Sequence, residues 1–330
     1  MHRTLVLAAA LGAAVSLTAC GAIDTGTGST AAPTSSQANA KPAACNQPRP
    51  YLAVALPNLT NPYYLAMKQG FEEQAQAKGF DAEVQIANDN DATQLAQVQA
   101  MLQKKPCALA LNAVKSEPAA AIVKAANQAG VPAFTVNVLV SDEALKDQGA
   151  SITQYLGADN VAGGTQVAQQ VLKDLGADAK LTIGFVTEPD EQPTLLRDQG
   201  FEQAIAADPN AKVVAKVDGN VKPDDSLRVA TEMISGHPDI NLIYANTGPG
   251  VYGTLQAVKG SSVKVYGFCA ADQSLNAQYP ACVAQEPEDY GRRVVDQIRG
   301  WVDGVAPPPQ ILRPLKMFTQ GTTPAPGEVG

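Results

Sequence analysis

The chain has 330 residues, of which 45% are hydrophobic and 17% are charged, and its formal net charge is −8. Its apolar content excludes an intrinsically disordered chain, and its length predicts one or two globular domains with a sizeable core. The acidic balance argues against the basic surface that binds nucleic acid, so no nucleic-acid partner is expected. The only two histidines are His2 and His237, which argues against a histidine-rich metal site and against a Ser/His/Asp triad; no metal is expected.

The amino terminus predicts export. Residues 1–19 contain Arg3 and an apolar run from Leu5 to Val15, a pattern typical of a signal peptide. The run is shorter than the roughly 18–20 residues that span a bilayer, so a transmembrane anchor is the weaker alternative. The Leu-Thr-Ala-Cys sequence that ends at Cys20 resembles the bacterial lipobox. This resemblance implies cleavage before Cys20 and acyl chains on that cysteine, which would anchor the protein to the membrane.

The next segment predicts a flexible tether. Residues 21–50 are almost wholly small or polar and cannot bury a core. We therefore assign residues 20–49 to the acylated cysteine and its tether. A lipid-anchored position is expected, on the outer face of the bacterial cytoplasmic membrane or in the periplasm.

From Tyr51 onward, short apolar runs alternate with amphipathic segments. The run at 51–56 is followed by Asn61 and Pro62, which mark the cap and first residue of a helix that extends to Gly79. Further strands are expected at 82–86, 107–111, 131–137, 181–186, 212–217, 240–245 and 263–268, each followed by a helical pattern. Alternation of this kind indicates parallel sheets with right-handed crossovers. So many strands exceed one compact sheet, and we predict an α/β fold of two doubly wound, Rossmann-like lobes.

Five cysteines occur, and assignment of Cys20 to the lipid leaves four. An even set in an oxidising compartment suggests two disulfides, for which three connectivities are possible. We favour Cys45–Cys107 and Cys269–Cys282, because each pair lies near the ends of strands that should be neighbours. Buried free thiols remain the alternative. The sequence has no C-x-x-C motif, so it gives no support for a redox enzyme or a zinc ribbon.

Ligands of open parallel sheets bind beyond the carboxyl ends of the strands. The residues expected at those ends are rich in carboxamides and include an aromatic pair; they are Asn58–Tyr64, Asn112, Asn137, Glu188–Arg197, Asn246, Cys269 and Gln285. Carboxamides donate and accept hydrogen bonds without charge, and the aromatic faces of Tyr63 and Tyr64 suit the apolar face of a ring. The set therefore suggests a neutral polyhydroxylated ligand. Asparagine is also a common cap and turn residue, so that role stays open for each Asn.

Several short motifs resemble, in order and spacing, the periplasmic sugar-binding proteins of the ribose-binding type over roughly residues 50–315. They are Asn61–Tyr64, Asp89–Asp91, Leu111-Asn112, Ala126–Pro132, Asp159-Asn160, Arg197 before Gly200-Phe201, His237–Asp239, Asn246, Gly267-Phe268 and Gln285. The resemblance implies the type I periplasmic-binding-protein fold, with two lobes joined by three crossing strands and a sugar bound in the cleft between them. It also implies a monomer that delivers its sugar to the permease of an ABC importer with a separate ATPase.

The lobes are then predicted to divide the chain as follows: 50–158 with 286–312 form the N-terminal lobe, 159–285 with 313–320 form the C-terminal lobe, and 321–330 form a tail. Opening and closing about the crossing strands would capture the ligand, with Gln285 at the hinge.

Carried over residue by residue, the resemblance implies an aromatic sandwich of Tyr63 and Tyr64. Polar contacts would come from Asn61, Asn112, Arg197, Asn246 and Gln285, and we add Asn137 to this set of ligand-binding residues.

Three positions depart from the family pattern. Asn137-Val138 stands where the family has Asp-Arg, and Cys269 stands where it has Asp. These changes remove charge-assisted hydrogen bonds of about 1.5–3 kcal/mol each. Ribose is therefore not expected, and a less hydroxylated sugar, a sugar alcohol or another small polar solute fits better. Replacement acceptors could come from Glu188, Asp190 and Glu191, whose alternative is a solvated loop.

Other classes of function are weaker. Gly248–Gly253 matches the dinucleotide fingerprint G-x-G-x-x-G, but Pro249 lies inside it and it falls in the second lobe, so no enzyme activity and no cofactor are expected. A sensor that signals through a membrane partner is the main alternative to transport. A related repressor is also a weaker alternative, because the predicted signal peptide and tether occupy the place of the DNA-binding motif that a repressor would need. His237 is assigned to a turn, and Trp301 to the core.

Overall fold

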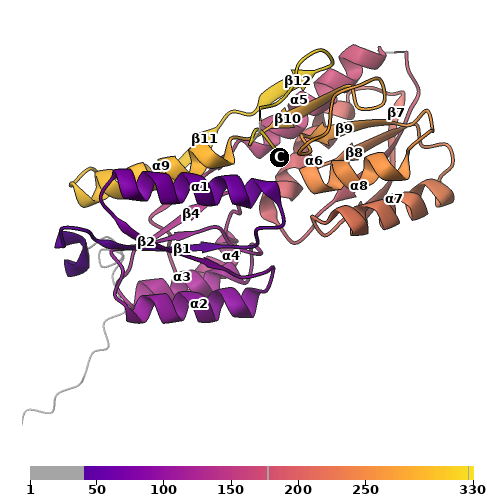
Figure 1. Cartoon of the computed structure of the whole chain (residues 1–330). Helices are drawn as coiled ribbons and strands as arrows, with labels where there is room; N and C mark the ends of the chain where they lie inside the picture. The colour runs from indigo at the N-terminus through magenta and orange to yellow at the C-terminus, as the bar shows by residue number, and fades with distance from the viewer. Residues whose placement is uncertain (1–40, 177, 326) are drawn as a thin grey trace, which may run out of the picture. The chain divides into compact units, whose positions relative to one another are not determined.

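The computed structural model describes residues 41–176, 178–325 and 327–330. They form two α/β lobes, each built on a six-stranded sheet (Figure 1). The expected signal peptide, Cys20 and the expected tether up to residue 40 lie outside the described residues. None of the helices in the described ranges combines the length and the apolar character needed to span a bilayer.

The first sheet has the strand order β2-β1-β3-β4-β5-β11, and its neighbouring strands are parallel. Its strands are β1 (Tyr51–Leu56), β2 (Asp81–Ile86), β3 (Ala108–Leu111), β4 (Ala133–Val136), β5 (Gln154–Ala158) and β11 (Gln310–Arg313). The four predicted strands of this lobe are confirmed with small shifts at their ends. β5 and β11 have no counterpart among the predicted strands.

The second sheet repeats this order as β7-β6-β8-β9-β10-β12. Its strands are β6 (Leu181–Thr187), β7 (Ala211–Asp218), β8 (Leu242–Ala245), β9 (Lys264–Phe268), β10 (Ala281–Ala284) and β12 (Lys316–Thr319). β12 runs antiparallel to β10, and the other neighbours are parallel. In both sheets the strand order reverses direction at the first strand, which makes each lobe doubly wound as predicted.

Helices cover both faces of each sheet. On the first sheet, α1 (Pro62–Ala77) and α9 (Pro287–Val302) pack on one face, with α2 (Asp91–Gln103), α3 (Ala119–Gln128) and α4 (Asp142–Gln148) on the other (Figure 1). On the second sheet, α5 (Asn160–Leu175) and α6 (Gln192–Ile205) pack on one face, with α7 (Pro223–Gly236) and α8 (Gly248–Ala257) on the other. β1 is consequently buried on both faces, as expected for a central parallel strand.

The chain passes between the sheets three times, between β5 and α5, between β10 and α9, and between β11 and β12. These three short segments are the crossings that the family resemblance implies. They are the segments that join the two lobes.

The two helix pairs that flank the crossings are in backbone contact. A Cβ at Gly164 in α5 would lie 1.9 Å from the carbonyl oxygen of Arg197 in α6, and one at Gly70 in α1 would lie 2.0 Å from that of Glu288 in α9. Only glycine allows this close approach. Each pair therefore packs too tightly for its helices to slide past one another.

Both disulfides occur in the pairing that the sequence favours, Cys45–Cys107 and Cys269–Cys282. Cys45 lies in the short 3₁₀ helix Ala43–Asn46 and is buried. Lys41 Nζ donates to the Val302 carbonyl oxygen at 3.1 Å, and so helps to hold this segment on the first lobe. The tether predicted to reach residue 49 is therefore shorter at its carboxyl end, because residues 41–49 are fixed by the disulfide and by hydrogen bonds.

Two further residues have the structural roles expected of them. Trp301 is buried and packs edge-on against Phe134, with ring centroids 6.1 Å apart. His237 caps the carboxyl end of α7, where its amide donates to the Met233 carbonyl oxygen at 2.9 Å.

Candidate ligand-binding site

The predicted site residues follow the carboxyl ends of strands in both sheets. In the first lobe Asn61 follows β1, Asn112 follows β3 and Asn137 follows β4. In the second lobe Arg197 lies in α6, Asn246 follows β8 and Gln285 follows β10.

Six of the eight predicted residues line one small cavity between the lobes. They are Asn61, Tyr63, Tyr64, Asn137, Arg197 and Gln285, and they are joined there by Glu191, Val221, Thr247 and Gly330. The cavity has a volume of about 20 Å³, which is room for about one water molecule. Both lobes thus supply polar groups to the same small cavity.

Tyr63 links the two lobes at this point. Its hydroxyl lies 2.9 Å from Asn137 Oδ1 and 3.1 Å from Gln285 Oε1. A phenol has one proton, so it can donate to only one of these oxygens at a time. Burial raises the pKa of Tyr63 well above its ordinary value, which keeps the hydroxyl neutral. The arrangement leaves hydrogen-bonding capacity for a neutral polar ligand.

The two tyrosine rings are not parallel. Tyr63 and Tyr64 are both buried, and their planes meet at 84° with centroids 5.4 Å apart. The two rings are therefore not arranged as the implied aromatic sandwich. They pack edge to face, which is a favoured geometry for two aromatic rings.

Asn137 is held in a conformation that few residues adopt. Its φ is +62°, its amide donates to the Leu156 carbonyl oxygen at 2.9 Å, and its own carbonyl oxygen accepts from the Tyr155 hydroxyl at 2.9 Å. Asparagine tolerates this left-handed region better than most residues. The backbone contacts thereby aim the Asn137 side chain at the cavity.

Asn61 combines its place at the cavity with the helix cap that the sequence predicts. Its Oδ1 accepts a hydrogen bond from the Tyr63 amide at 3.0 Å, and Pro62 is the first residue of α1. Because the cap occupies Oδ1, the amide nitrogen of Asn61 is the group best placed to serve a ligand.

Arg197 is a buried cation, with 4% of its surface exposed. Its Nε donates to Asn160 Oδ1 at 2.9 Å, its Nη1 donates to the Asn246 carbonyl oxygen at 2.7 Å, and its guanidinium lies 4.0 Å from the centre of the Phe268 ring. A guanidinium has five N–H donors. These contacts fix its position and leave donors for a ligand oxygen.

Asn112 and Asn246 are fully buried behind the cavity wall. Asn112 Oδ1 lies 3.5 Å from Asn137 Nδ2, and Asn246 Nδ2 donates to Asp198 Oδ1 at 2.9 Å. The Oδ1 of Asn246 has no hydrogen-bond partner within the described ranges. The Asn112 side chain thus lies beside Asn137 in the cavity lining, whereas Asn246 supports Arg197 through its backbone carbonyl oxygen. Direct contact of either side chain with a ligand stays a prediction.

An acidic group borders the cavity on the side of α6. Glu188 and Glu191 line a neighbouring cavity of about 180 Å³ together with Tyr64, Asp89 and Lys115. Lys115 pairs with Asp190 across the lobes. Glu188 is only 6% exposed, which excludes the solvated-loop alternative for that residue.

Burial changes the acidity of both glutamates. Desolvation raises the pKa of Glu188 to about 7, and desolvation with the nearby Glu188 raises the pKa of Glu191 to about 8, against the lowering effect of Arg197. The charges around them also include Asp89, Asp190, Asp218 and Lys115. Protonated carboxyls at this position can donate as well as accept a hydrogen bond.

These shifts predict a pH dependence of stability. Because the pKa of each carboxyl is higher in the folded chain than the ordinary value of 4.5, the folded state binds more protons than the unfolded state between about pH 4.5 and 8. The free energy of unfolding is therefore expected to decrease as the pH rises through this window. Urea unfolding at pH 5, 6.5 and 8 would measure it. Glu191→Gln should weaken this pH dependence, whereas the control Glu143→Gln, at an exposed position, should leave it unchanged. Stability that rises with pH in the parent and in both variants would contradict the expectation.

Val221 lines the cavity without any signal in the sequence. It has a φ of +50°, follows Asn220 at +52°, and borders three cavities between the lobes. A β-branched residue in the left-handed region is a clear outlier, and such strain is common at binding sites. Thr247 and Gly330 also line the cavity and are not among the predicted site residues, although Thr247 directly follows Asn246.

Two of the three glycines of the Gly248–Gly253 motif serve packing. A Cβ at Gly253 would lie 2.2 Å from the Pro223 carbonyl oxygen, and one at Gly248 would lie 2.7 Å from the Cys269 and Gly330 carbonyl oxygens. Close backbone approach therefore accounts for both residues without a dinucleotide. No group of three or more His, Cys, Asp or Glu side chains in the described part of the chain could hold a metal ion.

Comparisons with known proteins agree with this architecture. The chain is 27% identical over 275 residues to the ribose import binding protein of Bacillus subtilis, which covers 82% of this chain and 87% of the relative. It is 26% identical over 277 residues to the xylitol-binding protein of Mycolicibacterium smegmatis, which covers 82% of this chain and 71% of the relative.

Among solved structures, an ABC transporter solute-binding protein of Actinobacillus succinogenes with bound D-allose superposes with a TM-score of 0.73 at 23% identity, covering 83% of this chain and 98% of that chain. This similarity shows the fold. The relatives named here are binding proteins, in agreement with the expectation that the chain is not an enzyme. The family described as "Periplasmic binding protein domain" matches residues 52–304, and the chain belongs to that family.

Proposed function

We propose that this chain is an extracytoplasmic solute-binding protein that captures a small neutral polyhydroxylated ligand, a sugar or a sugar alcohol, and delivers it to an ABC importer. The observation that carries the proposal is the cavity between the lobes, where carboxamides, tyrosines and one buried guanidinium from both sheets converge. The ribose, xylitol and D-allose named for the relatives support the class of ligand.

The site favours a ligand that needs few charge-assisted contacts. Asn137 supplies a neutral amide, and Cys269 is engaged in a disulfide and cannot take the place of a carboxylate. Glu191 lines the cavity beside Arg197 and is the carboxyl group best placed to accept from a hydroxyl. Because the pKa of Glu191 is raised to about 8, this carboxyl is mostly neutral at pH 7 and does not supply a charge-assisted bond of about 1.5–3 kcal/mol. A sugar alcohol or a less hydroxylated sugar therefore fits a site with few charged groups better than ribose does.

Ligand capture would couple to closure of the lobes. The Gln192 amide donates to Ser116 Oγ at 2.8 Å, and Lys115 pairs with Asp190, so the lobes already touch beside the site. A ligand that contacts Tyr63 and Asn137 on one side and Arg197 on the other stabilises only the closed arrangement. Its differential affinity for that arrangement drives the closure.

The site of action follows from the amino terminus. The predicted signal peptide and Cys20 support a position on the outer face of the cytoplasmic membrane, held there by acyl chains. We expect a monomer that passes its ligand to a permease with a separate ATPase. This anchor needs the lipid, because a net charge of −8 would not bind an anionic membrane surface.

Thermal unfolding against a ligand panel tests the proposal. The panel contains D-ribose, D-allose, xylitol, myo-inositol and glycerol, with nucleosides and amino acids as controls. A ligand at about 100 times its Kd adds about 2.7 kcal/mol to the free energy of unfolding, which raises Tm by roughly 5–10 °C. A shift with one sugar or polyol is expected. Shifts with nucleosides or amino acids alone would contradict the proposed ligand class.

A further inference from the structure

The segment that follows β12 returns to the ligand site. The Val329 carbonyl oxygen accepts from the Gln285 amide at 2.9 Å, the Gly330 amide donates to the Cys269 carbonyl oxygen at 3.0 Å, and the Gly330 carbonyl oxygen accepts from the Gly248 amide at 2.6 Å. These bonds satisfy backbone groups at the ends of β8, β9 and β10, the edge where the second lobe presents its site.

The same segment also packs on the first lobe. Val329 is 7% exposed and belongs to the apolar cluster that contains Tyr63, Tyr64 and Met67. Burial of this valine among apolar side chains favours the docked position of the segment. Val329 and Gly330 therefore bridge the two lobes.

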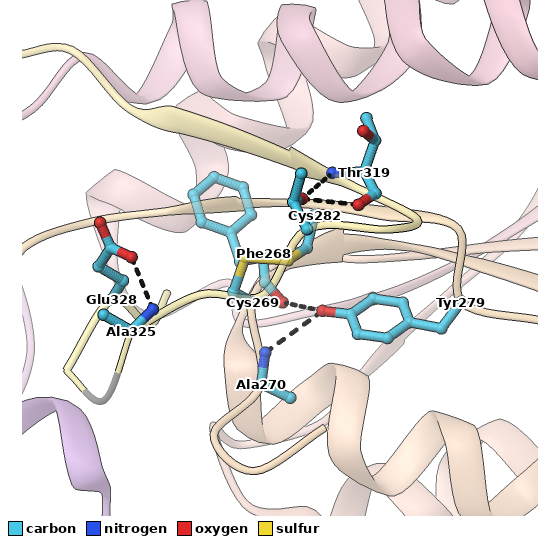
Figure 2. Close-up of a disulfide and its surroundings, with 9 residues drawn as sticks. Phe268, Cys269, Ala270, Tyr279, Cys282, Thr319, Ala325 and Glu328 are labelled. Carbon is cyan, nitrogen blue, oxygen red and sulfur yellow. Dashed lines mark hydrogen bonds between the residues drawn. A yellow bond between two sulfur atoms is a disulfide. The ribbon is translucent and has the colours of Figure 1, made fainter. Parts of the chain in front are cut away.

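The path to the cleft is fixed by a charged residue. The Glu328 carboxylate accepts from the Ala325 amide at 2.7 Å and pairs with Lys316 Nζ at 2.5 Å. Figure 2 shows Glu328 and Ala325 in the same view as the Cys269–Cys282 disulfide and Phe268. Gly330 lies against this Phe268, because a Cβ there would come within 2.5 Å of the Phe268 Cβ.

Gly330 stands between two cavities. It lines the cavity of about 20 Å³ beside Arg197, and it lines a cavity of about 370 Å³ between the lobes. The larger one has the size of a small-molecule site, whereas the smaller one holds the converging polar groups. Asn61 and Val221 border both cavities as well. Withdrawal of residues 328–330 would therefore remove part of the wall that the two cavities share.

We propose that Glu328–Gly330 is an intramolecular occupant of the ligand cleft and leaves it when the ligand enters. The inference rests on the proposed function for the class of ligand. It explains why polar groups from both lobes converge on a space that is too small for a monosaccharide. Affinity is then set partly by the fraction of molecules whose segment is withdrawn.

Two variants of the full chain weaken the docked segment and leave the predicted ligand-binding residues of both lobes unchanged. Gly330→Ala introduces the contact with Phe268, and Val329→Asp places a carboxylate in the apolar cluster. Gly236→Ala is the matched control, since a Cβ at that position meets nothing within 4 Å.

The readouts are amide hydrogen exchange at Gly330, followed by NMR, and calorimetric Kd values for the panel above. Without ligand, the Gly330 amide should be protected in the parent and in Gly236→Ala, and at least tenfold less protected in the other two variants. Saturation with the panel compound that binds should remove this protection in the parent. That compound should bind Gly330→Ala and Val329→Asp at least threefold more tightly.

Three results would overturn the inference: an unprotected Gly330 amide without ligand, protection that persists at saturation, or equal affinities in all four proteins. If no compound binds any of the proteins, the proposed function fails, and the Gly330 amide alone then decides whether the segment occupies the cleft.

Discussion

Replacement of Arg197 by alanine should weaken binding of the ligand more than tenfold and also destabilise the fold. The variant loses the guanidinium that lines the cavity, and it leaves Asn160 Oδ1 and the Asn246 carbonyl oxygen without their donor. Each buried acceptor left unpaired costs about 1–3 kcal/mol. Calorimetric titration gives the affinity, and urea unfolding gives the free energy of unfolding.

Two matched variants separate binding from scaffolding. Arg197→Lys keeps the charge but loses the planar fork of donors, so its affinity should fall while its fold is less affected than that of Arg197→Ala. Arg228→Ala removes an arginine whose side chain is 56% exposed, and it should change neither quantity. Unchanged affinity in Arg197→Ala would remove Arg197 from the site.

Removal of the Cys45–Cys107 disulfide is expected to have the largest effect on stability. The bond closes a loop of 62 residues, for which the chain-entropy relation gives about 4 kcal/mol. The double variant Cys45→Ala and Cys107→Ala should lower the free energy of unfolding by that amount in urea. Its ligand affinity should be unchanged, because Cys107 precedes β3 at the edge of the sheet opposite the cleft.

The second disulfide provides the comparison. Cys269–Cys282 closes a loop of 13 residues, so its removal by two alanines should cost about 3 kcal/mol. Cys269 lines the larger cavity and accepts from the Gly330 amide, and this variant should therefore also change the affinity. Free thiols at all four positions in the mass spectrum of the parent would contradict both expectations.

Much of the fold could be predicted because local signals and global packing agree. Asn61 and Pro62 start α1 where the cap chemistry requires, and the apolar runs that become β1 and β3 lie between two helix layers. The strands that were missed are short or have few apolar residues, such as β11 (Gln310–Arg313), whose place in the first sheet depends on pairing with β5. Such long-range pairing leaves no periodic pattern to detect.

The candidate site divides in the same way. Asparagines at strand ends could be located because parallel strands bring their carboxyl ends to one edge. The sequence could not predict which of these asparagines face the cleft. Asn246 donates to Asp198, whereas Asn137 contacts the Tyr63 hydroxyl. The left-handed backbone of Val221 and the return of Gly330 arise from tertiary contacts alone.

The glycine contact between α5 and α6 determines which helices would be displaced by a small rotation at the crossings. α5 begins directly after the first crossing and has 16 residues, which corresponds to a length of about 24 Å at 1.5 Å per residue. A turn of about 10° at its base would carry its far end roughly 4 Å through space. Because Gly164 lies against the backbone of Arg197, α6 would move together with α5. The displacement would be small near the cleft and larger toward the outer surface of the lobe.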